Sequence, residues 1–71
     1  MHWNYRIMVR RVQGGRLYGI HEVFYEGGKI TAWTESPVEP LGETPKEFRE
    51  TMNYMARALK KPILDYDKLT L

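Results

Sequence analysis

Hydrophobic and polar residues alternate in the first part of the chain, in the segment WNYRIMVRRV over residues 3–12. Its odd-numbered positions are aromatic or β-branched as far as Val9, and its even-numbered positions are mostly polar. A period of two with such residues is typical of a half-buried strand. Glycine pairs at positions 14–15 and 27–28 supply hairpin turns. The chain therefore opens with a predicted three-stranded antiparallel meander, with strands over residues 3–12, 17–25 and 29–35.

The pattern changes after residue 35. The segment 36–43 contains two prolines and a glycine and is predicted to be a loop that crosses from the sheet to a helix. Thr44, Pro45 and Glu47 form a capping box with proline at the first helical position. We expect one helix over residues 45–60. Its apolar residues recur at spacings of four, three and four and should pack on the sheet: Phe48, Met52, Met55 and Leu59.

The C-terminal segment 62–71, PILDYDKLTL, is too apolar for a fully solvated end. It is expected to pack back on the domain as a short strand or an irregular arm. With 71 residues the chain is long enough for one domain, near the lower limit for folding without disulfides or a metal. The predicted fold class is α+β: a three-stranded meander, one amphipathic helix packed on one face, and a C-terminal arm.

The register of the first hairpin decides which residues the helix covers. A strict two-residue turn at Gly14–Gly15 would place Glu22 on the same face as Tyr5 and Ile7. A three-residue turn with a bulge would instead join these two residues to Val23. Because a slip of one residue moves every side chain to the other face, the apolar pattern usually selects the register. We prefer the bulged register. In the second hairpin a turn at 27–28 would align Tyr25 with Ile30 and Val23 with Ala32.

One helix can cover only one face of this sheet, and apolar residues occupy both. The uncovered face would carry an aromatic patch with two charged residues that set orientation: Met8, Tyr18, Ile20, Phe24 and Trp33, with Arg6 and Glu22. A contiguous exposed patch of this kind usually marks an interface, and tryptophan, tyrosine and arginine are enriched at binding hot spots. The alternative is that the C-terminal arm folds across and covers this face.

The net charge is only +2, but its distribution is uneven. Residues 1–20 carry four arginines and no acidic residue, whereas residues 21–50 carry seven glutamates and three basic residues. Opposite charges on neighbouring strands can simply pair across the sheet. Alternatively the first hairpin could bind nucleic acid through Arg6, Arg10, Arg11 and Tyr18. Glutamates on the next strands would offset part of that attraction.

Little in the sequence points to catalysis. His21 and Glu22 are adjacent, so on a strand their side chains point to opposite faces and form no acid–base dyad. Asp65 and Asp67 flank Tyr66 on one side of a short segment and are expected to be a solvated acidic edge. There is no cysteine, which excludes disulfides and thiolate metal sites. We expect no catalytic, cofactor or metal-binding residues, and a cytoplasmic protein without a membrane span.

Two resemblances follow from these residues. The segments WNYR, YGIHEVFYE, WTESPV and GETPKEF, followed by LKKPIL, resemble a group of small bacterial proteins of unknown function. The loop-to-helix junction, with Gly42, Glu43, Thr44 and Glu47, is also similar to the HicB-type antitoxin domain, a partial ribonuclease-H-like fold of three strands, a helix and a short strand. The chain has ESPVEPL where that family has a D-x-P-G-C-type loop, and it has no separate DNA-binding segment.

The HicB-type resemblance implies a non-catalytic module that pairs with itself or with a protein target. Together with the aromatic patch, it leads us to expect a small non-enzymatic binding or regulatory protein. Such a protein would act by dimerisation or by binding a protein partner. The alternative is a nucleic-acid-binding module that uses the arginine-rich first hairpin.

Overall fold

The computed structural model describes residues 1–69 and, over that range, forms a four-stranded sheet with one α-helix. The last two residues of the predicted arm, 70–71, lie outside the described residues. The elements, in chain order, are β1 (His2–Val12), β2 (Gly15–Glu26), β3 (Lys29–Trp33), α1 (Pro45–Ala56), the 3-10 helix η1 (Arg57–Lys60), β4 (Leu64–Asp65) and the 3-10 helix η2 (Tyr66–Lys68).

The strands are ordered β3-β2-β1-β4 across the sheet. The first three are antiparallel, as predicted, whereas β4 lies parallel to β1, with Met8 opposite Leu64 and Val9 opposite Asp65. The α+β class is therefore confirmed. The C-terminal arm contributes a short strand, and this strand makes the sheet mixed rather than purely antiparallel.

The first hairpin does not have the bulged register that we preferred. Val12 lies opposite Gly15, so Gln13 and Gly14 form a two-residue turn in which Gly14 has a φ of 87°. Tyr5 consequently lies opposite Glu22. Tyr5 and Glu22 therefore share a face, as expected for a strict two-residue turn. The turn residues are 13 and 14, however, and not 14 and 15. The preference was wrong because it assumed that only one face of the sheet is buried.

The two faces of β1 and β2 follow from this register and from the alternation of side chains. The helix face carries the odd-numbered residues of β1 and the even-numbered residues of β2: Trp3, Tyr5, Ile7, Val9, Arg11, Arg16, Tyr18, Ile20, Glu22, Phe24 and Glu26. The arm face carries the remainder: His2, Asn4, Arg6, Met8, Arg10, Val12, Gly15, Leu17, Gly19, His21, Val23 and Tyr25.

The second hairpin turns at Gly27 and Gly28, which have φ angles of 58° and 80°. Tyr25 lies opposite Ile30, as predicted. The register then shifts, and Val23 pairs with Trp33 instead of Ala32. This irregularity moves Trp33 to the arm face, where its indole ring meets Tyr66 at a centroid distance of 6.4 Å.

The helix begins as predicted. Thr44 is its N-cap and its hydroxyl accepts a hydrogen bond from the Glu47 N–H at 3.1 Å, with Pro45 in the first turn. The Glu47 carboxylate accepts from the Glu43 N–H at 2.9 Å. The α-helical geometry ends at Ala56 and continues as the 3-10 turn η1 to Lys60, so the predicted length is approximately right.

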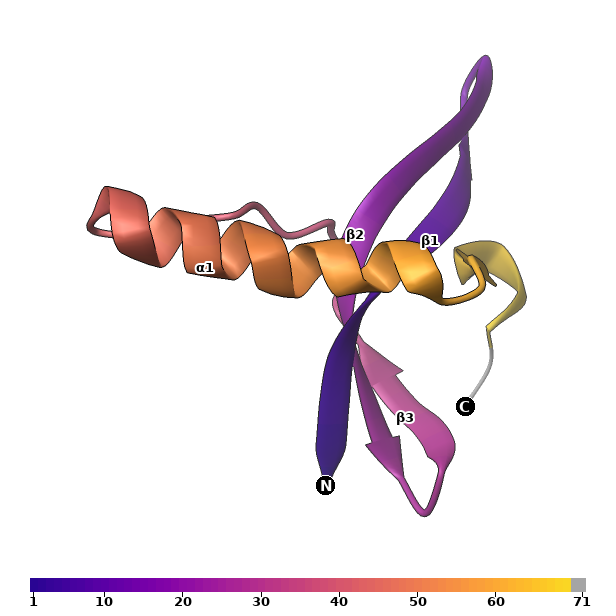
Figure 1. Ribbon diagram of the computed structural model, residues 1–71. Helices are drawn as coiled ribbons and strands as arrows, with labels where there is room; N and C mark the ends of the chain where they lie inside the picture. The colour runs from indigo at the N-terminus through magenta and orange to yellow at the C-terminus, as the bar shows by residue number, and fades with distance from the viewer. Residues whose placement is uncertain (70–71) are drawn as a thin grey trace.

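Figure 1 shows α1 lying across the β1–β2 hairpin, with the N-terminal half of the helix beyond the strands. Residues 41–50 are accordingly all exposed. The core is small, and five residues of the described chain are buried: Met8, His21, Val23, Met55 and Ala58. Of the predicted helix stripe only Met55 is buried. The expectation that the whole stripe packs on the sheet is therefore wrong.

Candidate functional site

An aromatic cluster fixes the position of the helix on the helix face of the sheet. The ring of Tyr54 stacks on Trp3 at a centroid distance of 5.7 Å and meets Tyr5 edge-on at 5.4 Å. The Arg57 guanidinium lies over the Tyr54 ring itself, 5.0 Å from its centroid. Offset and edge-on aromatic contacts of this kind stabilise packing beyond the area they bury.

Burial in this cluster raises the pKa of the Tyr5 hydroxyl above its ordinary value. The negative charge of Glu22, directly opposite in the register, and the neighbouring Tyr54 raise this pKa further. Burial and a nearby carboxylate both disfavour the phenolate. Tyr5 is therefore held as a neutral hydroxyl and is poorly suited to act as a base near neutral pH.

Next to this cluster an apolar groove of about 360 Å³ lies between the helix and the sheet. Its lining is Ile7, Ile20, Pro40, Met52, Met55, Ala56 and Leu59. Met52 is 45% exposed and Leu59 is 74% exposed, although both belong to the apolar stripe of the helix. Phe48, one turn earlier in that stripe, is 42% exposed. A single copy of the chain thus leaves three of the four stripe residues partly exposed to water.

The arm face is covered by the C-terminal segment. The Tyr66 ring of η2 lies 5.7 Å from the His21 ring, and the Arg10 guanidinium lies 4.2 Å from the centroid of Tyr66. Met8 and Val23, which lie on the same face, are completely buried. The structure therefore shows the alternative in which the arm covers the second face. That face differs in composition from the expected one, because Met8 shares it with Val23 and not with Ile20 and Phe24.

His21 has a structural environment. It is 2% exposed, and its Nδ1 lies 2.9 Å from the Thr34 carbonyl oxygen. That contact makes Nδ1 the protonated nitrogen in the neutral ring, because a carbonyl can only accept. Glu22 lies on the opposite face, and its N–H donates to the Thr34 hydroxyl at 3.2 Å. The two residues are held by the same threonine but do not form an acid–base pair.

The residues of the predicted aromatic patch do not share one surface. Arg6, Met8 and Trp33 lie on or beside the arm face, and Met8 is fully buried there. The other four lie on the helix face: Tyr18, Ile20, Glu22 and Phe24. The prediction of a single patch depended on the bulged register. Because the hairpin has the other register, the predicted residues are distributed over both faces of the sheet. Tyr18 is the most exposed of the apolar members, at 55%.

The four residues of the predicted nucleic-acid surface also separate. The Arg6 guanidinium donates to the Tyr25 hydroxyl at 3.1 Å and to the Pro62 carbonyl at 2.6 Å. Arg10 donates to the Glu35 carbonyl at 3.2 Å. These two arginines hold the C-terminal segment and the crossing loop. Arg11 and Tyr18 remain exposed on the helix face.

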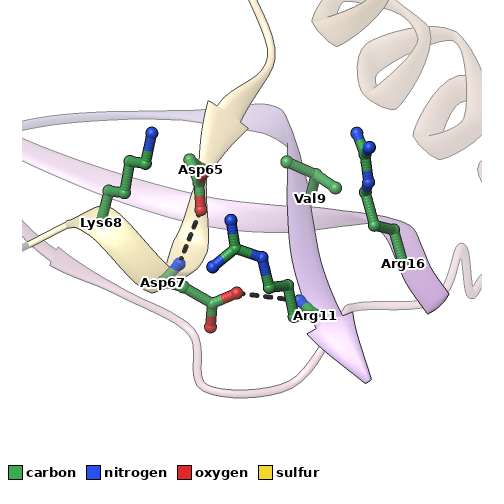
Figure 2. A pocket seen from close by; sticks show the side chains of 6 residues that line it. All are labelled: Val9, Arg11, Arg16, Asp65, Asp67 and Lys68. Atoms are coloured by element: carbon green, nitrogen blue, oxygen red, sulfur yellow. Dashed lines mark hydrogen bonds between the residues drawn. The ribbon is translucent and has the colours of Figure 1, made fainter. Parts of the chain in front are cut away.

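Arg11 belongs to a charged cleft of about 290 Å³ at the end of the first hairpin. Figure 2 shows its six lining residues: Val9, Arg11, Arg16, Asp65, Asp67 and Lys68. Asp67 accepts a hydrogen bond from the Arg11 N–H at 2.8 Å, and Asp65 accepts one from the Asp67 N–H at 3.0 Å. The Asp67 side chain thus joins the C-terminal segment to β1, and the Asp65 side chain caps η2, although both were expected to form a solvated edge.

Sequence reasoning missed the groove and two cations of the cleft, Arg16 and Lys68. A signal for the groove was present, because a helix that starts after a long crossing loop can rest on the sheet with only part of its length. No comparable signal links Lys68 to the first hairpin, since the contact depends on β4 pairing with β1.

Within residues 1–69 no helix is long and apolar enough to cross a membrane, and no three histidine or acidic side chains of these residues gather where they could hold a metal ion. Comparisons of the chain with protein-family models, with curated proteins and with solved structures find no match. The resemblances to the small bacterial proteins and to the HicB-type antitoxin domain therefore stay predictions.

Proposed function

We propose that the chain is a non-enzymatic binding and regulatory module that forms a homodimer through its apolar groove. The observation that carries this proposal is the exposure of the helix stripe. Met52 and Leu59 line the groove, yet they are 45% and 74% exposed in one copy of the chain. A partner with apolar side chains would remove this surface from water, which is the main favourable contribution to protein association.

The helix itself needs such a partner. It has 12 residues, and only one of them, Met55, is buried. Isolated helices shorter than about 12–15 residues are marginal in water, and tertiary packing supplies most of their stability. The N-terminal half of α1 extends beyond the strands (Figure 1). The crossing loop passes over its first turn, yet residues 45–50 remain exposed. A second copy would supply further packing.

The spacing of the stripe favours a second copy of the same helix. Phe48, Met52, Met55 and Leu59 follow each other at four, three and four residues. This is the spacing of the apolar seam between two packed helices. A two-fold axis near Met52 would place the exposed residues of one stripe against those of the other, because an interface of this symmetry uses the same patch twice.

The charges next to the stripe favour an antiparallel arrangement. Residues 43–50 carry three glutamates with Lys46 and Arg49, a net charge of −1. Residues 57–61 carry Arg57, Lys60 and Lys61, a net charge of +3. An antiparallel pair would set the first segment of one copy against the second segment of the other. Complementary charge at the rim of an interface favours the correct orientation.

The size of the molecule is compatible with this arrangement. A standard interface removes about 800 Å² from each partner, which is about one seventh of the 5597 Å² accessible surface of the chain. The groove, the exposed stripe and the neighbouring strand residues could supply that area. Ile20, one of the contact residues expected from the sequence, lines the groove, so the proposal retains part of the predicted surface.

Sedimentation equilibrium of the purified chain tests the proposal. The wild type should sediment as a dimer, and Met52→Glu should sediment as a monomer because it places a carboxylate in the apolar seam. Asn53→Glu is the matched control. Asn53 is exposed and does not line the groove, so this variant should remain dimeric. Far-ultraviolet circular dichroism would show whether each variant keeps its fold. A wild type that stays monomeric at the highest accessible concentration would refute the dimer.

A further inference from the structure

Two arginines lie directly opposite each other near the end of the first hairpin. Arg11 of β1 is paired with Arg16 of β2, and both side chains are exposed on the helix face. Like charges directly opposite on neighbouring strands are destabilising. An anion that contacts both arginine side chains would relieve this repulsion.

The surroundings add a third cation to this pair. Lys68 lines the same cleft of about 290 Å³ (Figure 2). Two carboxylates also line it, but each already accepts a backbone hydrogen bond: Asp67 from the Arg11 N–H and Asp65 from the Asp67 N–H. Three cations and two carboxylates leave the cleft with a net charge of +1. The Asp67 carboxylate holds η2 against β1, and the Asp65 carboxylate caps η2.

The hairpin that carries the pair projects from the body of the molecule. Figure 1 shows the joined ends of β1 and β2 extending away from both α1 and β3. All residues from 11 to 18 are exposed, including Leu17 at 54% and Tyr18 at 55%. A two-stranded ribbon is narrow enough to enter the major groove of duplex DNA. The first 20 residues contain no acidic side chain that would repel phosphate.

We propose that this projecting ribbon binds the phosphodiester backbone of duplex nucleic acid through Arg11 and Arg16, with Lys68 as a third contact. Guanidinium groups bind phosphate oxygens in a bidentate manner, which suits a paired arginine site better than a single point charge. The proposed site differs from the surface expected from the sequence, because Arg6 and Arg10 are hydrogen-bonded to other parts of their own chain. It does not depend on the homodimer.

Fluorescence anisotropy of a labelled duplex of about 15 base pairs tests the proposal, with binding measured over a range of salt concentrations. Three phosphate contacts predict a slope of log affinity against log salt of about −2 to −3. The double variant Arg11→Gln/Arg16→Gln should bind at least about tenfold more weakly, and its slope should fall to about −1. Glutamine keeps the backbone N–H that Asp67 accepts, so η2 should remain in place.

A second double variant serves as the control, because it also removes two positive charges but at positions outside the cleft. Lys46→Gln/Arg49→Gln lies on the exposed N-terminal part of α1 and should bind the duplex like the wild type. The proposal also predicts that Arg16→Gln raises the thermal midpoint in the absence of nucleic acid, since it removes the repulsion within the pair. Sedimentation of the same samples would show whether the oligomeric state has changed, which separates this site from the groove.

Five outcomes would each overturn the assignment. The first two are failure of the duplex to bind even at low salt and binding with a slope near zero. The third is equal binding by the wild type and by the variant lacking both arginines. The fourth is competition by polyglutamate that is as effective as competition by the duplex, which would make the cleft a general anion site. The fifth is tighter binding of a single strand of the same sequence than of the duplex, which would exclude docking of the ribbon in a groove.

Discussion

Arg6 brings a charged group to the partly buried arm face and connects three distant parts of the chain. Its guanidinium, on β1, donates to the Tyr25 hydroxyl on β2 and to the Pro62 carbonyl that precedes β4. Its Nε is buried and has no hydrogen-bond partner within the described residues. The cost of burying this unpaired donor offsets part of the stabilisation that the two hydrogen bonds supply. Through these two hydrogen bonds Arg6 holds the start of the C-terminal segment against the sheet.

We expect Arg6→Met to lower the free energy of unfolding by about 1–2 kcal/mol, because two charge-assisted hydrogen bonds are lost while one unpaired nitrogen is removed. Arg6→Lys should not restore the loss, since one ammonium group cannot reach both acceptors in the same geometry. Urea denaturation measures the change. Arg16→Gln, at the exposed hairpin end, should show no loss. Equal stability of Arg6→Met and the wild type would mean that these two hydrogen bonds do not contribute to the free energy of unfolding.

At this scale the sequence could reveal residue types but not their partners. The alternation of residues 3–12 correctly indicated which side of β1 Arg6 and Arg10 share. It could not indicate that Arg6 contacts Pro62 or that Arg10 contacts Tyr66, because the residues of each pair are more than 50 positions apart in the chain. For the same reason both arginines were assigned to an external ligand instead of to internal contacts.

At the scale of elements, the junction between the crossing loop and α1 depends on Gly42. A Cβ atom added to this residue would lie 2.5 Å from the Phe48 backbone nitrogen and 2.9 Å from the Glu47 carbonyl carbon. Backbone atoms of a capped helix start cannot move aside easily, since Thr44 and Glu43 are hydrogen-bonded to Glu47. Glycine therefore permits the loop to pass directly over the first turn of the helix.

Gly42→Ala should lower the free energy of unfolding by about 1–3 kcal/mol, the usual cost of inserting an atom into occupied space. Gly15→Ala is the matched control, because a Cβ there meets no atom within 4 Å and the residue lacks a positive φ. That control should be neutral or should gain up to about 1 kcal/mol through the unfolded state. Chemical denaturation followed by the helical circular dichroism signal compares them. A Gly42→Ala variant as stable as Gly15→Ala would contradict the close approach.

The elements also show where sequence patterns stop being informative. Strand periodicity and the capping signals of Thr44, Pro45 and Glu47 correctly predicted the meander and the start of the helix. The register of the first hairpin was wrong because a two-sided sheet buries apolar residues under both the helix and the arm. The apolar pattern then no longer selects one register.

At the scale of the whole molecule, the sequence correctly indicated that some apolar surface would stay exposed, but it predicted the wrong location for that surface. The arm covers the face with Met8 and Val23, whereas part of the helix stripe remains in water. Which surface stays open depends on how far α1 extends beyond the strands, and no local pattern determines that. The projecting hairpin is a similar case, since its exposure follows from the length of β1 and β2 relative to the body.

Dimerisation should make the stability of the chain depend on its concentration. A dimer that unfolds to two separate chains becomes more stable by about 1.4 kcal/mol for each tenfold increase in concentration, by mass action. We therefore expect the thermal midpoint of the wild type to rise steadily over a concentration series measured by circular dichroism. Met52→Glu should show a lower midpoint that does not change with concentration, because this variant unfolds as a monomer. Asn53→Glu should follow the wild type.

The concentration series also distinguishes two explanations for the exposed stripe. If the stripe is merely tolerated at the surface of a stable monomer, the wild-type midpoint will be constant and Met52→Glu will match it, since surface substitutions usually change stability by less than about 0.5 kcal/mol. If the stripe is the core of an interface, the wild type and this variant will diverge as the concentration increases. The small core of the single chain, with Met8, Val23, Met55 and Ala58 as its buried apolar residues among those described, favours the second result.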